Sequence, residues 1–392
     1  MASTPESQDS ELRNDRRIVA YGLGMILLVG LLLFIPNLVP SSTHAVVSDL
    51  VHARIVSVAP VQAGEQPSAT VVILDGSQTG ARVTAVLQGP SSQLQLPDYR
   101  AGDEVVVSID HQPGSPIAYD VVDRWRLPLL GVLAAAFVLV AAGIAGWRGL
   151  RAVVSLVLTI GFTIRLLIPL LLLGWDPVAL AVVFGIAVTA LSFLLTQGPT
   201  RTTLAAIIGT SSGLLITGVL AAIVTAAAQF TSAQGSEEIV TLGQLVGNRI
   251  DLSGLLLAAV IFGGLGVLND VAMSQAATVE ELAHADPTLD ARALYARAMN
   301  VGVAHLAATI NTLVFAYLGT ALPLLVILSI QVSSLGDAVN QEVIAVEVVR
   351  TLVGSLGILA AVPLTTAITA AWQSRETGGE ASPLPVASES GG

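Results

Sequence analysis

Cysteine and lysine are both absent from this 392-residue chain, and charged residues make up only 11% of it. The lack of cysteine excludes disulfides, thiolate catalysis and cysteine metal sites. Soluble proteins normally carry about a quarter charged residues. The low charge, with 53% hydrophobic residues and a mean hydropathy of +0.78, therefore excludes an ordinary water-soluble chain. The net charge is -11 without a basic face, so nucleic acid is not an expected partner.

Several catalytic signatures are also missing. The chain has no phosphate-binding Gly-Lys-Ser/Thr loop, no HExxH, no GxSxG and no dinucleotide fingerprint. These absences disfavour an ATPase, a zinc protease and a serine hydrolase, so we expect no enzyme activity and no cofactor. An intramembrane hydrolase is a weaker alternative, because aspartyl chemistry usually needs two carboxylates that share a proton.

The first long apolar run covers residues 18–36, directly after Arg13, Arg16 and Arg17. It is long enough to cross a hydrocarbon core of about 30 Å. The preceding arginines predict that residues 1–17 form a cytoplasmic tail. A cleaved signal peptide is the alternative, but the run exceeds the apolar stretch of about 7–15 residues that is usual there.

Residues 41–122 have a different character, with short β-branched runs separated by Gly, Pro and Asp turns. The runs lie at residues 52–59, 69–74, 81–87 and 104–109. They predict a small extracytoplasmic β-domain of about five strands, for which an OB-like barrel is our guess. Such a domain could be a spacer or oligomerisation cap, or a lid or partner-docking module.

Apolar runs resume from residue 125 to residue 373 and predict a polytopic α-helical membrane domain. With the first anchor we count about eight crossings. The remaining spans are expected near 127–147, 152–173, 177–196, 203–228, 252–276, 301–334 and 350–373. Arginines on alternate loops favour one orientation, with those loops in the cytoplasm. Residues 374–392 are rich in Gly, Ser, Glu and Pro and predict a disordered tail.

The run 301–334 is too long for one upright span and too short for two with a turn. Gly319 and Pro323 would mark a break, giving a full span followed by a re-entrant or half helix. Broken helices tend to line binding cavities in transporters.

Polar residues inside membrane spans are costly and are candidate sites by default. Asp270 and Ser274 share a helix face, with Gln275 next to them, and could offer oxygen ligands to a cation or proton. A hydrated interfacial carboxylate is the alternative. Whether any of these residues holds a metal is not decided by the sequence.

A second polar stripe is formed by His305, Thr309 and Thr312, with Asn311 nearby. Such a stripe could line a water-filled path, and His305 could exchange a proton near neutral pH. Interhelical hydrogen bonding is the alternative, and for the two threonines it is the stronger one.

The remaining candidates are charged residues and glycines. Arg165 lies inside a span and could snorkel outward, contact an anion or pair with Asp270. Glu347 and Arg350 are three residues apart and are expected to form a structural pair. Small residues allow close helix packing, and this is the expected role of five glycines: Gly209, Gly213, Gly263, Gly264 and Gly266.

The sequence resembles the YibE/F family of bacterial multi-span membrane proteins in three runs. These are 263–282 (GGLGVLNDVAMSQAATVEEL), 305–319 (HLAATINTLVFAYLG) and 348–366 (VVRTLVGSLGILAAVPLTT). The resemblance implies a bacterial cell membrane, a permease-like annotation and no established substrate. It also implies two adjacent aspartates where this chain has Asn269-Asp270, so Asp270 alone would carry the charge.

We therefore expect a multi-pass protein of the bacterial inner membrane that acts as a secondary transporter or exporter of a small solute or ion. Its partners would be the lipid bilayer, that solute and a second copy of the chain if it forms a homo-oligomer. The rival hypothesis is a non-transporting scaffold that acts through the extracytoplasmic β-domain.

Overall fold

The computed structural model describes residues 49–59, 66–87, 98–110, 116–230, 237–331 and 334–380. The predicted cytoplasmic tail, the first anchor and the last residues of the predicted C-terminal tail lie outside these ranges. The chain divides into two compact units, which are considered separately. One holds the β-barrel and the start of the first long helix, up to Ile144, and the other holds the helical bundle from Ala145 onward.

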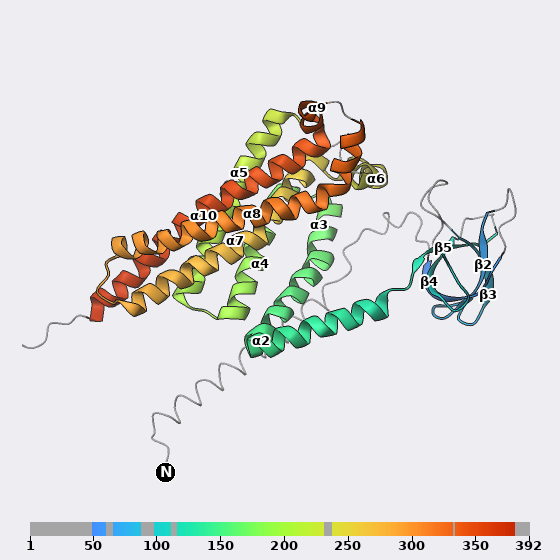
Figure 1. The fold of residues 1–392 in the computed structure, drawn as a ribbon, viewed down its shortest axis with the longest axis horizontal. Helices are drawn as coiled ribbons and strands as arrows, with labels where there is room; N and C mark the ends of the chain where they lie inside the picture. The colour runs from blue at the N-terminus through green and yellow to red at the C-terminus, as the bar shows by residue number, and fades with distance from the viewer. Residues whose placement is uncertain are drawn as a thin grey trace, which may run out of the picture. The chain divides into compact units, whose positions relative to one another are not determined.

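Five strands form the barrel: β1 (Asp49–Val58), β2 (Ser68–Ile73), β3 (Arg82–Leu87), β4 (Glu104–Asp110) and β5 (Ala118–Arg124). They close in the order β1-β2-β3-β5-β4, and β1 pairs with β4 to complete the ring. The β3–β5 pair is parallel and the other pairs are antiparallel. The expected small β-barrel is therefore present (Figure 1).

Alternation of side chains explains why four of these strands were recognisable from sequence. In β4, Val105, Val107 and Ile109 point into the core, and the residues between them are partly exposed. β5 has only one buried residue, Val121, and this weak alternation left no clear strand signal.

Charged side chains join β1 to β4 on the barrel surface. Glu104 accepts hydrogen bonds from Arg54 Nη2 at 2.8 Å and from His52 Nε2 at 3.2 Å. The His52 ring also stacks on Trp125, with ring centroids 4.1 Å apart. The hydrogen bond from Arg54 lowers the pKa of Glu104 below its ordinary 4.5, with a smaller contribution from His52 and opposition from burial.

The helical unit consists of long apolar helices. A kinked helix starts the series as α2 (Leu127–Phe162), the π-helical η2 (Thr163–Leu167) and α3 (Ile168–Leu172). It is followed by α4 (Pro177–Gln197), α5 (Arg201–Ala228), α6 (Glu237–Val246), η3 (Gly247–Arg249), α7 (Leu252–Ala285), α8 (Ala291–Gln331), α9 (Leu335–Asn340) and α10 (Glu342–Glu380).

Six of the described helices are long and apolar enough to cross a membrane. The two spans expected at 127–147 and 152–173 form one helical run of 46 residues, Leu127–Leu172. A kink at Gly146, whose φ of 56° suits glycine, divides this run instead of a loop. The count of eight crossings stays a prediction, because the first of them lies outside the described residues.

The predicted break at Gly319 and Pro323 is wrong, because α8 continues through both residues to Gln331. Proline removes one backbone hydrogen bond, and membrane helices tolerate this loss when neighbouring groups compensate. α8 is a continuous helix of 41 residues that starts at Ala291, ten residues before the predicted span. At the other end, α10 reaches Glu380 and so includes residues 374–380 of the predicted tail.

The centre of the bundle is formed by α7 and α10, which contact each other and both pack against α5 and α8 (Figure 1). Thr189 of α4 donates a hydrogen bond to Asn269 of α7 at 2.9 Å, and the ideal Cβ of Gly185 lies 3.6 Å from Leu265. Gly185 precedes Thr189 on α4, and Leu265 precedes Asn269 on α7. The contacts therefore follow the same direction along both helices, and α4 and α7 run parallel. A short connection, residues 286–290, links α7 to α8.

The closest helix contact joins α5 and α10 in an antiparallel pair. A Cβ added to Gly209 would overlap the side chain of Thr365 and lie 3.1 Å from its Cα. A Cβ on Gly213 would lie 2.8 Å from Ala361, and one on Gly357 would overlap Thr217. The glycines therefore let the two backbones approach each other.

The other predicted packing glycines differ from one another. Gly263 faces the Tyr317 hydroxyl, and a Cβ on Gly264 would make ordinary contact with Gly354 at 3.8 Å. Gly266 has nothing within 4 Å of its ideal Cβ, so the packing role predicted for it is wrong. The Gly266 position is exposed on the outer face of α7.

Gly209→Ala should lower stability by about 1–3 kcal/mol, because the new methyl group collides with Thr365 backbone and side-chain atoms. Gly266→Ala is the matched control and should be neutral or slightly stabilising, since alanine favours helix by up to about 1 kcal/mol. The two variants are compared by heating each protein in detergent and measuring the temperature at which half of its monodisperse size-exclusion peak is lost. Equal midpoints would contradict the packing argument.

The barrel should lose stability in acid. Because the pKa of folded Glu104 is depressed, its contribution is fully present above 4.5 and is lost as the pH falls through the lower, folded-state pKa. Hydrogen exchange of β1 and β4 amides in the full chain, corrected for intrinsic rates, should show this loss. In a Glu104→Gln protein the protection of these amides should depend less on pH. If the acid-induced loss of protection is unchanged in this variant, other carboxylates cause it.

Candidate functional site

A charged cluster lies inside the helical bundle where α7, α8 and α10 meet. Arg350 Nη1 donates hydrogen bonds to both carboxylate oxygens of Glu347, at 2.8 and 3.1 Å. Both side chains are largely buried, with 21% and 25% of their areas exposed. The Arg350 guanidinium carbon also lies 6.0 Å from the centre of the Tyr317 ring, which allows a cation–π contact.

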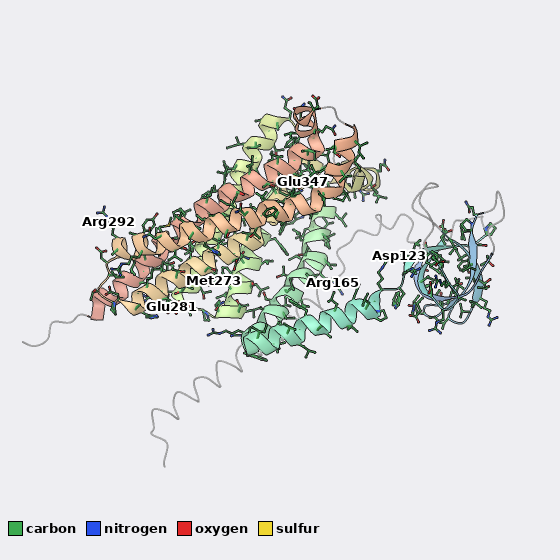
Figure 2. The ribbon with its side chains drawn as sticks, in the orientation of Figure 1. Asp123, Arg165, Met273, Glu281, Arg292 and Glu347 are labelled. Atoms are coloured by element: carbon green, nitrogen blue, oxygen red, sulfur yellow. The ribbon has the colours of Figure 1, made fainter. Side chains whose placement is uncertain are left out.

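The cluster lies near the middle of the apolar part of α7. An ideal Cβ on Gly263 would be 3.6 Å from Arg350 Cδ. Gly263 follows the first residue of α7 by about 16 Å at about 1.5 Å per residue, roughly half of a 30 Å hydrocarbon core. Figure 2 shows Glu347 well away from Glu281 and Arg292, which lie where α7 meets α8.

The hydrogen bonding of the cluster is incomplete. Arg350 Nε and the Tyr317 hydroxyl are shielded from solvent and have no hydrogen-bond partner among the described residues. Both bonds to Glu347 come from Nη1, and Nη2 makes no hydrogen bond to the described residues. Buried donors without acceptors are costly, so Nε and the Tyr317 hydroxyl favour the arrival of an acceptor.

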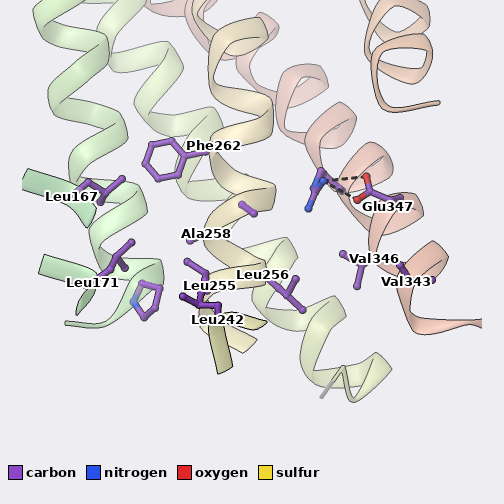
Figure 3. Close-up of a pocket in the computed structure, with 13 residues that line it drawn as sticks. Leu167, Leu171, Leu242, Leu255, Leu256, Ala258, Phe262, Val343, Val346 and Glu347 are labelled. Carbon is purple, nitrogen blue, oxygen red and sulfur yellow. Dashed lines mark hydrogen bonds and ion pairs between the residues drawn. The ribbon is translucent and has the colours of Figure 1, made fainter. Parts of the chain in front are cut away.

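A cavity of about 450 Å³ adjoins the pair. Among the described residues its lining is apolar except for Glu347 and Arg350, and it comes from helices on several sides (Figure 3). Leu167 and Leu171 face it from η2 and α3, Phe262 from α7 and Val346 from α10. A second cavity of about 320 Å³ includes Tyr317 and Glu347 in its wall. Glu347 thus lines both cavities.

The residues predicted for an ion path are not gathered in one place. Asp270 and Ser274 are exposed on the outer face of α7, and Asp270 forms no hydrogen bond or ion pair within the described ranges. The predicted pairing of Asp270 with Arg165 is therefore wrong. Arg165 is itself exposed in η2. A uniformly apolar helix gives no amphipathic period from which this outward placement could be read.

Gln275 has a packing role at the α7–α8 contact. Its amide nitrogen donates a hydrogen bond to the carbonyl of Ala298 at 2.9 Å, and its side chain lies against Gly302. This buried bond joins the two helices close to the turn between them.

The polar stripe on α8 divides between bundle and exterior. Thr309 is buried and donates to the carbonyl of His305, while Thr312 donates to Ala308 on an exposed face that also carries Asn311. His305 is partly buried, and its Nε2 has no partner among the described residues. Only His305 of this stripe retains unused hydrogen-bonding capacity inside the bundle.

Sequence reasoning missed Tyr317 and gave the Glu347–Arg350 pair only a structural role. A signal was available, because Tyr317 continues the row of every fourth residue from His305 through Thr309 and Leu313. The described residues contain no group of three or more His, Asp or Glu side chains that could hold a metal ion.

The pair should be coupled energetically. Glu347→Gln alone leaves the Arg350 charge without a carboxylate, and Arg350→Gln alone leaves the Glu347 carboxylate without a cation. Each should cost about 1–3 kcal/mol, whereas the double variant should cost less than the sum. Thermal stability in detergent tests this cycle, and simple additivity would show that the pair contributes no interaction energy.

The family comparison matches the part of the chain that forms this bundle. The model of the family described as YibE/F-like protein matches residues 133–375. No curated protein and no solved structure in the comparison matches the chain. The match covers more than half of the sequence and includes α7, α8 and nearly all of α10. The chain is therefore a membrane protein that belongs to the YibE/F-like protein family.

Proposed function

We propose that this protein is a secondary transporter that carries a small solute across a bacterial inner membrane, along a path that passes the Glu347–Arg350 pair. The observation that supports it is a partly satisfied ion pair about 8–12 Å along the membrane-length helix α10, in the wall of an apolar cavity. Ionisable groups at such depth are costly and mark substrate or ion paths in membrane proteins.

The bundle supports one orientation for this path. Arg201 lies between α4 and α5, and Arg292 lies at the start of α8. Because α4 and α7 run parallel, both arginines are at the same end of the bundle. By the positive-inside tendency this end would face the cytoplasm, and the cavity would lie toward the outer half of the membrane. The N-terminus would be cytoplasmic and the barrel extracytoplasmic.

The site differs from the one that the sequence favoured. Asp270 is exposed on α7, so the proposed path relies on Glu347, Arg350 and Tyr317, with His305 as an additional proton-exchanging candidate. Tyr317 and His305 both belong to α8, so one helix would carry both groups along the path.

Flux in sealed proteoliposomes tests the proposal. Organic anions, phosphate, amino acids and metal cations are compared with and without a pH gradient. Arg350→Gln should abolish flux, because the path loses its charged group, while Arg292→Gln should leave it near the wild-type rate. Arg292 is the matched control, since it is exposed at the α7–α8 end of the bundle.

Three results separate the alternatives. Flux that survives in Arg350→Gln would remove this pair from the path. Flux that survives Asp270→Asn and His305→Ala together would exclude those two residues. No flux of any solute through wild-type protein would favour the second candidate, a scaffold acting through the barrel, which has a hydrophobic core of its own.

A further inference from the structure

The bonding of Arg350 leaves one edge of its guanidinium without a hydrogen-bond partner among the described residues. The Nη1 group contacts Glu347, whereas Nε and Nη2 make no hydrogen bond within the described ranges. Nε and Nη2 carry parallel N–H groups on one edge, the arrangement that binds two oxygens of a carboxylate or phosphate at once. The edge that matches an anion best is therefore unused by the protein's own carboxylate.

The surroundings hold the guanidinium in place. Glu347 contacts it through Nη1, and the Tyr317 ring lies beside it at 6.0 Å. Arg350 Cδ packs near Gly263, where an added Cβ would overlap the Tyr317 hydroxyl and make ordinary contact with Arg350 Cδ at 3.6 Å. A positioned guanidinium loses less conformational freedom when it binds a ligand.

The cavity next to Arg350 suits the rest of such a ligand. Its volume of about 450 Å³ is within the range of small-molecule sites. Leu171, Leu255, Phe262, Val343 and Val346 contribute apolar surface, and Glu347 is the only acidic residue among the described ones that line it. A fully hydrophilic ion would lose its hydration there without compensation, whereas a hydrocarbon group would gain by burial.

From the free arginine edge and the apolar cavity, we propose that this site binds an amphiphilic organic anion. Its carboxylate or phosphate would pair with Nε and Nη2 of Arg350, and its hydrocarbon part would occupy the cavity. The proposal deepens the proposed function, since it names the substrate class of the same site. Glu347 contacts Nη1 and places a second negative charge beside the ligand's anion. Replacing it with glutamine keeps an acceptor for Nη1 and removes that repulsion, so binding should strengthen.

Equilibrium binding to the purified full-length protein in detergent tests this independently of transport. Octanoate, octyl phosphate, octanol and acetate are compared by isothermal titration below the micelle concentration of each ligand. Octanoate or octyl phosphate should bind, while octanol lacks the anion and acetate lacks the apolar part, so both should bind at least about tenfold more weakly. A preference for octyl phosphate would indicate a lipid-like phosphate, and a preference for octanoate would indicate a free carboxylate.

Three variants assign the site. Glu347→Gln should bind the anion more tightly than wild type, because the repelling negative charge is gone while the glutamine oxygen can still accept a hydrogen bond from Nη1. Arg350→Lys keeps the charge but loses the two-nitrogen edge, and should bind about tenfold more weakly. Leu171→Asn should reduce the preference for octanoate over acetate.

Equal binding of octanol and octanoate, or weaker binding in Glu347→Gln with its fold intact, would overturn the proposal. Anion binding without flux would support the binding site and contradict the transport function. Flux of a hydrophilic solute without anion binding would support transport and contradict the anion site.

Discussion

The antiparallel contact between α5 and α10 constrains the whole helical unit. Lipid offers no hydrophobic force between helices, so they associate by close packing and hydrogen bonds. Gly209, Gly213 and Gly357 remove the side chains that would separate the two backbones. The contact therefore determines which face of α10 turns inward, and with it the direction in which Glu347 and Arg350 point.

The charged pair is stabilised by its surroundings but not fully satisfied by them. One guanidinium nitrogen holds both oxygens of Glu347, and Nε and Nη2 make no hydrogen bond to the described residues. A purely structural pair would gain from two-nitrogen contact, which binds a carboxylate more strongly. This incomplete pairing, in a residue that lines an apolar cavity, is what motivates the proposed anion site.

The barrel has the surface of a domain in water, whereas the helical bundle has the surface of a domain in lipid. In the barrel, Val71, Val105 and Val121 are buried and the polar residues are outside, as water requires. In the bundle, Val219 of α5 is 60% exposed and Phe315 of α8 is 70% exposed. Such surfaces are stable in lipid, where the interior of the bundle is the place for hydroxyl, amide and charged groups.

The sequence by itself determined the membrane class, four of the five strands, and Gly209 and Gly213 as packing glycines. These features depend on local composition and short-range periodicity, which can be recognised without knowing the tertiary contacts. Tertiary structure alone decided that Asp270 faces outward, that α8 passes Pro323 unbroken and that Tyr317 joins Glu347 and Arg350. A helix that is apolar on every side has no periodicity that marks its inner face. That face is chosen by contacts between residues far apart in the chain, such as Gly263 on α7 with Tyr317 on α8.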